Sequence, residues 1–248
     1  SNTALINLLT NLFIGLSIGA NVVAARHYGA KAWDDLRRTV HTAMLLSMLS
    51  GALLLVLGVI GAEQMLIWMQ TPEEVLPLAT VYLRIYFLGM ISTMVYNFGS
   101  ALLRAVGDTK RPLYFLLMAS FLNIGLDLLC IIVFKMGVFG ASFATVFSQA
   151  VAGFGSLWYI ARHYHELRWS KEEGKLSRDH CLKLCNMGIP MGLQCSITAI
   201  GSVVLQGAVN GLGSDIVAAQ TAGGKAAQFL SVPLESIGTA MTTYASQN

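Results

Sequence analysis

Long stretches without a charged residue are the feature that most restricts what this chain can fold into. Five of them are entirely uncharged, at residues 3–25, 43–62, 85–103, 136–161 and 186–214. Two more, at residues 112–134 and 216–245, carry only Asp127 in the first and Lys225 and Glu235 in the second. A helix needs about 20 apolar residues to cross a hydrocarbon layer about 30 Å thick. The stretches therefore predict seven membrane-spanning helices in an all-α, polytopic bundle.

Composition and pattern both favour a membrane setting over a soluble one. Only 12% of the residues are charged and 55% are hydrophobic, whereas soluble domains are about 25% charged because their surfaces face water. Strands that cross a membrane are shorter, about 10 residues, and alternate apolar with polar positions. The uncharged stretches show no such alternation, which argues against membrane-spanning strands.

Basic residues gather at alternate ends of the expected spans. Of the 16 Lys and Arg residues, all except Arg84, Lys135 and Lys225 follow the first, third or fifth span. These basic segments lie at residues 26–38, 104–111 and 162–183. Cytoplasmic loops of membrane proteins carry an excess of Lys and Arg. We therefore predict that this side faces the cytoplasm and that the first span runs inward from the outside.

A polar segment at residues 162–185 divides the expected helices into two units. It carries Glu and Lys residues around Gly174, a composition typical of a linker. We predict a first unit at residues 1–161 and a second at residues 186–248, joined by this cytoplasmic linker. The chain does not begin with Met, and a first span that runs inward implies an earlier helix. We therefore expect the first unit to lack its first helix.

Asp127 is the sharpest candidate for a functional residue. It lies in the fourth expected span, and Asn123 precedes it by one helical turn on the same face. An ionised Asp at the bilayer centre costs about 2.5–3.5 kcal/mol on insertion scales, so such a residue normally faces a cavity, a partner or an ion. Together with Thr145 of the next span, these oxygens could bind Na⁺, or Asp127 could accept a proton. A buried Asp–Asn pair that only locks two helices is the structural alternative.

Three further residues are candidates for a substrate path. Lys225 is an intramembrane cation, although its side chain could instead extend to the membrane interface. Gln149 lies one turn after Thr145 and offers another oxygen. Tyr96 belongs to a set of aromatic and Met residues that suits flat organic cations, or simply helix packing.

The sequence offers no constellation of residues for ATP-driven transport or for catalysis. A phosphate-binding glycine loop followed by Lys and Ser or Thr does not occur, and no Ser-His-Asp or metal-dependent hydrolase set is visible. The histidines all fall on the predicted cytoplasmic side, where we expect them to be solvated. Cys181 and Cys185 lack a second pair at zinc spacing, so reduced and unpaired cysteines are expected. We predict no catalytic residue, no enzyme activity and no cofactor, and no metal apart from Na⁺ at Asp127.

Four motifs resemble the multidrug and toxic compound extrusion (MATE) family of efflux transporters. Residues 104–112, Arg-Ala-Val-Gly-Asp-Thr-Lys-Arg-Pro, resemble the loop between its fourth and fifth helices and are the most specific match. Residues 18–30 resemble its second helix and the Gly-Ala turn that follows. Residues 188–190, Gly-Ile-Pro, resemble the start of its seventh helix, and residues 245–248 resemble the end of its eighth. The resemblance covers nearly the whole chain.

The resemblance implies a twelve-helix, two-lobe transporter of which this chain supplies helices two to eight. In that family, alternating access exports drugs or toxins against the entry of Na⁺ or H⁺. In some members an Asn and an Asp on helix five and a Thr on helix six join an Asp on helix one around the coupling cation. Asn123, Asp127 and Thr145 match the first three positions, and helix one is absent from this chain. The chain alone is then not expected to transport.

These inferences together predict secondary active efflux of drugs or toxic organic cations by antiport with Na⁺ or H⁺. The expected setting is a bacterial plasma membrane, in which the protein is multi-pass. Its partners would be small organic substrates, membrane lipid and the missing helices of the same full-length protein, with no nucleic acid. A lipid-linked oligosaccharide flippase of the same superfamily is the alternative, although such proteins tend to line their cavity with several cations. A membrane enzyme is a third and more remote alternative.

Overall fold

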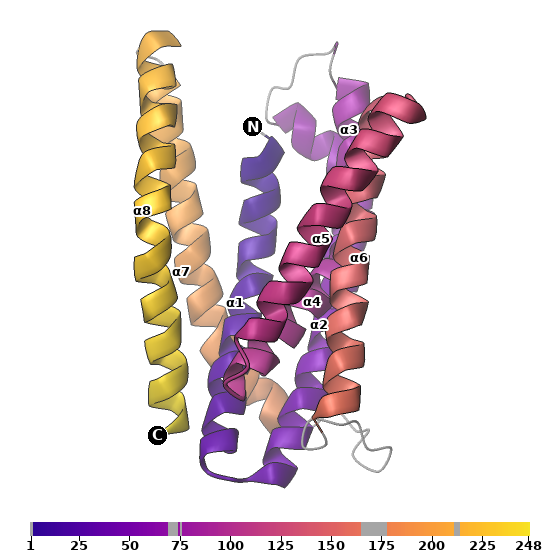
Figure 1. Cartoon of the computed structure of the whole chain (residues 1–248). Coiled ribbons are helices and arrows are strands. Elements are labelled where there is room, and N and C mark those ends of the chain that lie inside the picture. The colour runs from indigo at the N-terminus through magenta and orange to yellow at the C-terminus, as the bar shows by residue number, and fades with distance from the viewer. Residues whose placement is uncertain (1, 69–73, 75, 165–177, 211–213) are drawn as a thin grey trace.

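The computed structural model describes residues 2–68, 74, 76–164, 178–210 and 214–248, and the regular elements within them are all helical. In chain order they are α1 (Asn2–Gly29), α2 (Trp33–Trp68), α3 (Leu76–Leu88), α4 (Met90–Ala105), α5 (Lys110–Leu128), the π-helical turn η1 (Leu129–Val133), α6 (Gly137–His163), α7 (Arg178–Asn210) and α8 (Ser214–Gln247). The helices run roughly side by side as a bundle (Figure 1). The prediction of an all-α membrane bundle is confirmed.

Each of the seven expected spans coincides with a helix or with a pair of helices. Among the described residues, three helices are long and apolar enough to cross a membrane: Trp33–Ile67, Lys110–Val133 and Gly137–His163. A fourth span results if α3 and α4, which are bent by 45° relative to each other, count as one. The less apolar helices α1, α7 and α8 occupy the other three stretches, with 28, 33 and 34 residues. All three exceed the length of about 20 residues that a span requires.

The bend between α3 and α4 centres on Gly89. Its N–H donates to the Tyr86 carbonyl at 3.1 Å, which is the tighter hydrogen-bond spacing of a 3₁₀ turn. A Cβ atom at this position would lie 2.8 Å from Cγ2 of Val146 on α6. Glycine therefore allows α6 to approach the bend more closely than any other residue type would.

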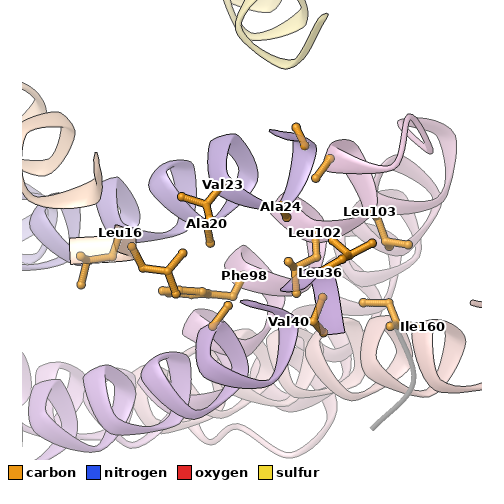
Figure 2. Close-up of a cluster of buried hydrophobic side chains, with 14 residues drawn as sticks. Leu16, Ala20, Val23, Ala24, Leu36, Val40, Phe98, Leu102, Leu103 and Ile160 are labelled. Carbon is orange, nitrogen blue, oxygen red and sulfur yellow. The ribbon is translucent and has the colours of Figure 1, made fainter. Parts of the chain in front are cut away.

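The first apolar cluster of the molecule lies toward the basic end of the bundle, which we define as the end where residues 26–38, 104–111 and 162–163 lie. Helices α1, α2, α4 and α6 contribute to it, and Leu184 of α7 joins them. Its labelled members in Figure 2 are Leu16, Ala20, Val23, Ala24, Leu36, Val40, Phe98, Leu102, Leu103 and Ile160. Lipid is as apolar as Leu, so within the bilayer such packing stabilises mainly through close contact and not through exclusion of water.

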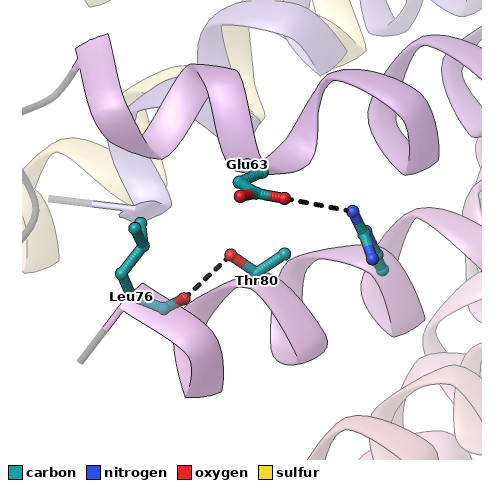
Figure 3. Close-up of polar contacts among 4 residues, drawn as sticks. Glu63, Leu76 and Thr80 are labelled. Carbon is teal, nitrogen blue, oxygen red and sulfur yellow. Dashed lines mark hydrogen bonds and ion pairs between the residues drawn. The ribbon is translucent and has the colours of Figure 1, made fainter. Parts of the chain in front are cut away.

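A second apolar cluster joins α2 to α3 and α4, and polar contacts flank it. It is built around Leu66, Leu83 and Phe87. Nearby, Nη2 of Arg84 lies 3.5 Å from Oε2 of Glu63, and the Thr80 hydroxyl donates to a carbonyl one turn earlier in α3 (Figure 3). The Arg84 and Glu63 side chains are 47% and 58% exposed, so this ion pair contributes at most about 1 kcal/mol.

Helices α1 and α7 cross with their backbones in direct contact, and we call the contact of α7 and α8 with the first unit, which includes this crossing, the lobe seam. Each helix carries two glycines four residues apart, Gly15 and Gly19 on α1 and Gly188 and Gly192 on α7. A Cβ atom on Gly19 would lie 2.7 Å from the Cα atom of Gly188, and one on Gly15 would overlap the backbone of Gly192. The crossing is therefore made by two facing Gly-xxx-Gly motifs, the arrangement that brings membrane helices closest together.

The linker is shorter than the sequence analysis proposed. Helix α7 already begins at Arg178, so residues 178–185, which we assigned to the linker, form its first turns. Asp179 in the first turn interacts favourably with the positive end of the helix dipole. Helix α6 ends at His163, and residues 165–177 of the predicted linker lie outside the described residues. The division into two lobes remains a prediction.

Candidate ion-coupling site

Helices α5 and α6 bring two of the three predicted ion-coupling residues into contact. The side-chain amide Nδ2 of Asn123 on α5 donates to Oγ1 of Thr145 on α6, at 3.4 Å. The Thr145 hydroxyl donates in turn to the carbonyl of Ala141 one turn earlier, at 3.0 Å. This second bond orients the Thr145 oxygen so that it accepts from Asn123. The hydrogen bond that joins the two helices is therefore made by Asn123 and Thr145, and not by a pair of Asp127 and Asn123.

Asp127 lies one turn further along α5 on the same face as Asn123. Its side chain is half-buried, and its Oδ1 atom is shielded from solvent without a hydrogen-bond partner in the described part of the chain. A buried carboxylate oxygen without a donor carries a desolvation penalty, which a bound cation or proton removes. The geometry thus leaves a carboxylate oxygen available beside an amide and a hydroxyl, which are hard oxygen ligands of the kind that Na⁺ accepts.

A π-helical turn, which was not predicted from the sequence, follows Asp127 almost directly. In η1 the N–H of Phe134 donates to the carbonyl of Leu129, five residues earlier, at 3.1 Å. Single π turns inside α-helices occur frequently at functional sites. Here Cys130 of the turn packs against Gly140 of α6, where an added Cβ atom would lie 2.8 Å from the Cβ of Cys130. The residues of the turn contain neither Gly nor Pro, so no local signal reveals it.

The three substrate-path candidates lie in different parts of the molecule. Gln149 is half-buried on α6, one turn beyond Thr145, and so lies beside the candidate ion-coupling site. The Tyr96 hydroxyl on α4 donates to the carbonyl of Pro112 at 3.0 Å, which holds the first turn of α5. Lys225 is exposed on α8, and Figure 1 shows α8 and α5 on opposite sides of α1. The structure thus brings Gln149 close to the predicted coupling residues and places Lys225 on a separate helix.

The basic loop at residues 104–112 is tied to the end of α6 by one side chain. Oδ1 of Asp108 accepts from the backbone N–H of Arg111 at 3.2 Å, and its Oδ2 accepts from the Tyr164 hydroxyl at 2.7 Å. Burial and this hydrogen bond both raise the pKa of Tyr164, so its hydroxyl stays protonated as a donor. The guanidinium of Arg111 lies 5.0 Å from the centre of the Tyr159 ring. The most specific motif of the sequence therefore has a structural role in this loop.

The fold and this site define a multi-pass helical membrane protein with a polar cluster between two of its spans. A family model described as MatE matches residues 2–129, slightly more than half of the chain. The chain belongs to this family, which is the one that its motifs resemble.

Curated relatives and a solved structure agree with this assignment. The chain is 36% identical over 196 residues to the protein named "Probable multidrug resistance protein YpnP" of Bacillus subtilis, covering 77% of this chain and 42% of that protein. It is 29% identical over 248 residues to "Probable multidrug resistance protein YoeA" of the same organism, covering 97% of this chain and 54% of that protein. A solved structure described as a MATE protein in the bent conformation matches with a TM-score of 0.90 at 23% identity, covering 96% of this chain and 54% of the other. The chain spans about half the length of the curated relatives it matches.

Proposed function

We propose that the full-length protein is a secondary active transporter that exports drugs or toxic organic cations in exchange for Na⁺ or H⁺. The observation that carries this proposal is a carboxylate oxygen of Asp127 that lies near the Asn123–Thr145 hydrogen bond, is shielded from solvent and has no hydrogen-bond partner among the described residues. The names of the relatives YpnP and YoeA, both described as multidrug resistance proteins, support the substrate class.

In this proposal Asp127 alternates between a charged state without a bound ion and a neutralised state with a bound cation or proton. A cation or proton that enters from outside neutralises the carboxylate and removes its desolvation penalty, and the amide oxygen of Asn123 and the hydroxyl oxygen of Thr145 complete part of the ligand set. A residue outside this chain would complete the rest. In the same proposal Gln149 would connect this site to a substrate in the first lobe, and Tyr96 and Lys225 would contact the substrate further along its path.

Transport also requires the two predicted lobes, residues 1–161 and 186–248, to move relative to each other. In the structure they meet at the basic end, where Gln247 Nε2 of the second unit donates to the Ala105 carbonyl of the first, at 2.7 Å. If the basic end is cytoplasmic, this arrangement corresponds to a transporter that is closed on the inside. Binding of an ion at Asp127 would favour one arrangement of the lobes only through a difference in affinity between the two arrangements.

The proposal is tested by efflux of a fluorescent organic cation from bacterial cells that make the full-length protein. Asp127→Asn keeps the size of the side chain and removes the charge, so efflux is expected to fall at least tenfold. Asp34→Asn, at an exposed position in the first turn of α2, is the matched control and should leave efflux unchanged. Wild-type efflux from the Asp127→Asn protein, made at equal amounts in the membrane, would refute the proposal.

A further inference from the structure

Two hydrogen bonds and the glycine crossing close the lobe seam toward its basic end. Nδ2 of Asn21 on α1 donates to Oγ1 of Thr243 on α8, at 3.1 Å, and Gln247 reaches the Ala105 carbonyl of α4. Asn21 is only 2% exposed. A Cβ atom on Gly29, at the end of α1, would overlap the backbone of Gln247. Helices α7 and α8 are thus held against the first unit along this end of the bundle.

Two histidines face each other across this closed seam. His27, in the last turn of α1, and His180, in the first turn of α7, have ring centres 5.9 Å apart with the planes tilted by 43°. Nε2 of His180 lies 3.6 Å from Oδ1 of Asp35 on α2, so the contact joins three helices. Nε2 of His27 is shielded from solvent and has no hydrogen-bond partner within the described ranges. We call His27, His180 and Asp35 the seam triad.

The burial of these histidines contradicts the expectation that they are solvated. His180 is 5% exposed and His41 9% exposed, while His27 is half-buried. Only His163 is exposed as expected among the described histidines, and His165 lies outside the described residues. The sequence places His27 and His180 more than 150 positions apart, so their meeting follows only from the way in which α7 crosses α1.

The charges around the seam triad disfavour protonated imidazoles. Burial is the main cause that lowers the pKa of both His27 and His180. The cationic neighbours that lower them further are Arg26 on α1, Arg38 on α2 and Lys183 on α7, and the two histidines interact unfavourably with each other when charged. Asp35 raises the pKa of both rings, and Asp179 raises that of His180. The pKa of each ring is nevertheless lowered overall. Both rings lie at helix ends within the basic segments, outside the uncharged stretches of the sequence.

We propose that the seam triad is a proton-binding site on the cytoplasmic side that controls whether the lobe seam stays closed. With neutral imidazoles the two rings pack against each other and the seam is shut. Protonation places two positive charges beside each other and beside three basic side chains, with Asp35 as the nearest anion. The lobes then separate at this end, and both rings reach water. Within the described residues no group of three or more His, Cys, Asp or Glu side chains is arranged to hold a metal ion.

The direction of the pH effect follows from linkage. In the open seam the histidines are solvated and titrate near their ordinary pKa of about 6.5. In the closed seam their pKa values are lower, so the open form binds more protons as the pH falls. The closed form is therefore favoured above about pH 6.5 and loses stability as the pH falls through that value. Acidification of the cytoplasm would open the seam on the inside.

This inference assumes, as the proposed function does, that the two units move relative to each other, but it concerns a different site. Asp127 lies toward the opposite end of α5 from the basic end and is not part of the seam triad. The regulation can therefore fail while the transport proposal stands, and the test below does not depend on drug efflux.

The test is a distance measurement between spin labels in the full-length protein, reconstituted in lipid nanodiscs, at pH 7.5 and pH 5.5. Labels at Lys110→Cys in the first unit and Asn248→Cys at the end of α8 report on the basic end, after the native cysteines are replaced by Ser. We expect the ratio of the longer-distance to the shorter-distance population to rise at pH 5.5, by up to about tenfold for each histidine, because this pH lies about one unit below the ordinary histidine pKa. The variant with His27→Gln and His180→Gln should lose this pH response. His163→Gln, at an exposed histidine on the same side, should keep it.

Two results would overturn the proposal. One is a distance distribution in the unsubstituted protein that does not change between the two pH values. The other is a response that persists in the double histidine variant or disappears in the His163→Gln control. If the double variant does not fold, His27→Gln alone serves as the test, because it removes one of the two facing rings and should reduce the response by at least half. Efflux that depends on Asp127 while the distances stay constant would refute the seam switch and leave the transport proposal intact.

Discussion

The lobe seam and the α5–α6 site are built on opposite principles. At the seam, facing glycines bring two backbones into contact, and Asn21, Thr243 and Gln247 take part in hydrogen bonds across it. At the α5–α6 site one hydrogen bond of 3.4 Å joins the helices, a π turn interrupts α5, and a carboxylate oxygen of Asp127 has no donor among the residues described. The seam is arranged to hold one conformation tightly. The α5–α6 site retains an unsatisfied group, which is what a binding site for a small ion requires.

The largest effect is expected from adding bulk to the seam. Gly19→Leu forces a side chain against the Gly188 backbone, which cannot move aside in the way that a flexible side chain can. Overpacking of this kind costs about 1–3 kcal/mol or more, which corresponds to roughly a 5- to 150-fold loss of the closed population. The spin-label distance at the basic end should therefore lengthen at pH 7.5.

Gly223→Leu is the matched control for this prediction. A Cβ atom at Gly223 of α8 meets nothing within 4 Å, so the same substitution there should leave the distance unchanged. A Gly19→Leu protein with the unsubstituted distance distribution would show that the glycine crossing does not keep the seam closed.

An intermediate effect is expected from the hydroxyl at the α5–α6 site. Thr145→Ala removes the acceptor of the Asn123 amide and one candidate ligand oxygen, a loss of about 0.5–1.5 kcal/mol. The ion concentration that gives half-maximal efflux should rise roughly two- to tenfold. Thr145→Ser retains the hydroxyl and should behave like the unsubstituted protein. Equal ion dependence in all three proteins would remove Thr145 from the coupling site.

An effect in the same free-energy range, but on stability and not on transport, is expected at the loop of residues 104–112, which belongs to neither region. Tyr164→Phe removes the hydroxyl that donates to Asp108 and should lower the free energy of unfolding by about 0.5–1.5 kcal/mol, measured as a lower Tm in detergent. The folded state raises the pKa of Tyr164, so its contribution is complete below about pH 10, the ordinary tyrosine value, and is lost only as the pH rises through the folded pKa. The Tm difference should therefore be the same at pH 7 and pH 9. A difference that vanishes at pH 9 would contradict this assignment.

The comparison between the two regions also shows what the sequence could predict. Asn123 and Asp127 are four residues apart in one stretch that carries no other charge, so helix periodicity placed them on one face and the intramembrane charge made Asp127 a candidate. The approximate positions of the spans also followed from hydropathy, because the bilayer sets a minimum helix length, but helices such as α2 and α7 extend beyond the uncharged stretches. Local sequence patterns are therefore sufficient to predict a feature when the residues that form it are close in sequence, or when the membrane determines it.

The seam could not be predicted in this way. Gly19 and Gly188 meet only because two distant helices cross. Near the same crossing His180 is buried, although its place on the predicted cytoplasmic side suggested that it is solvated. The π turn after Asp127 likewise packs against Gly140 of α6, and its own residues contain neither Gly nor Pro. Tertiary contacts decided these features, and a single sequence does not contain them.

The central claim is that Asp127 couples ion entry to substrate export, and ion movement in proteoliposomes tests it most directly. The full-length protein would be reconstituted, an organic cation gradient imposed, and the exchange of Na⁺ or H⁺ followed with radioactive Na⁺ and a pH-sensitive dye in the lumen. We predict that the unsubstituted protein moves one of these ions against the substrate and that Asp127→Asn moves neither. Substrate-driven ion exchange by the Asp127→Asn protein at the unsubstituted rate would contradict the account.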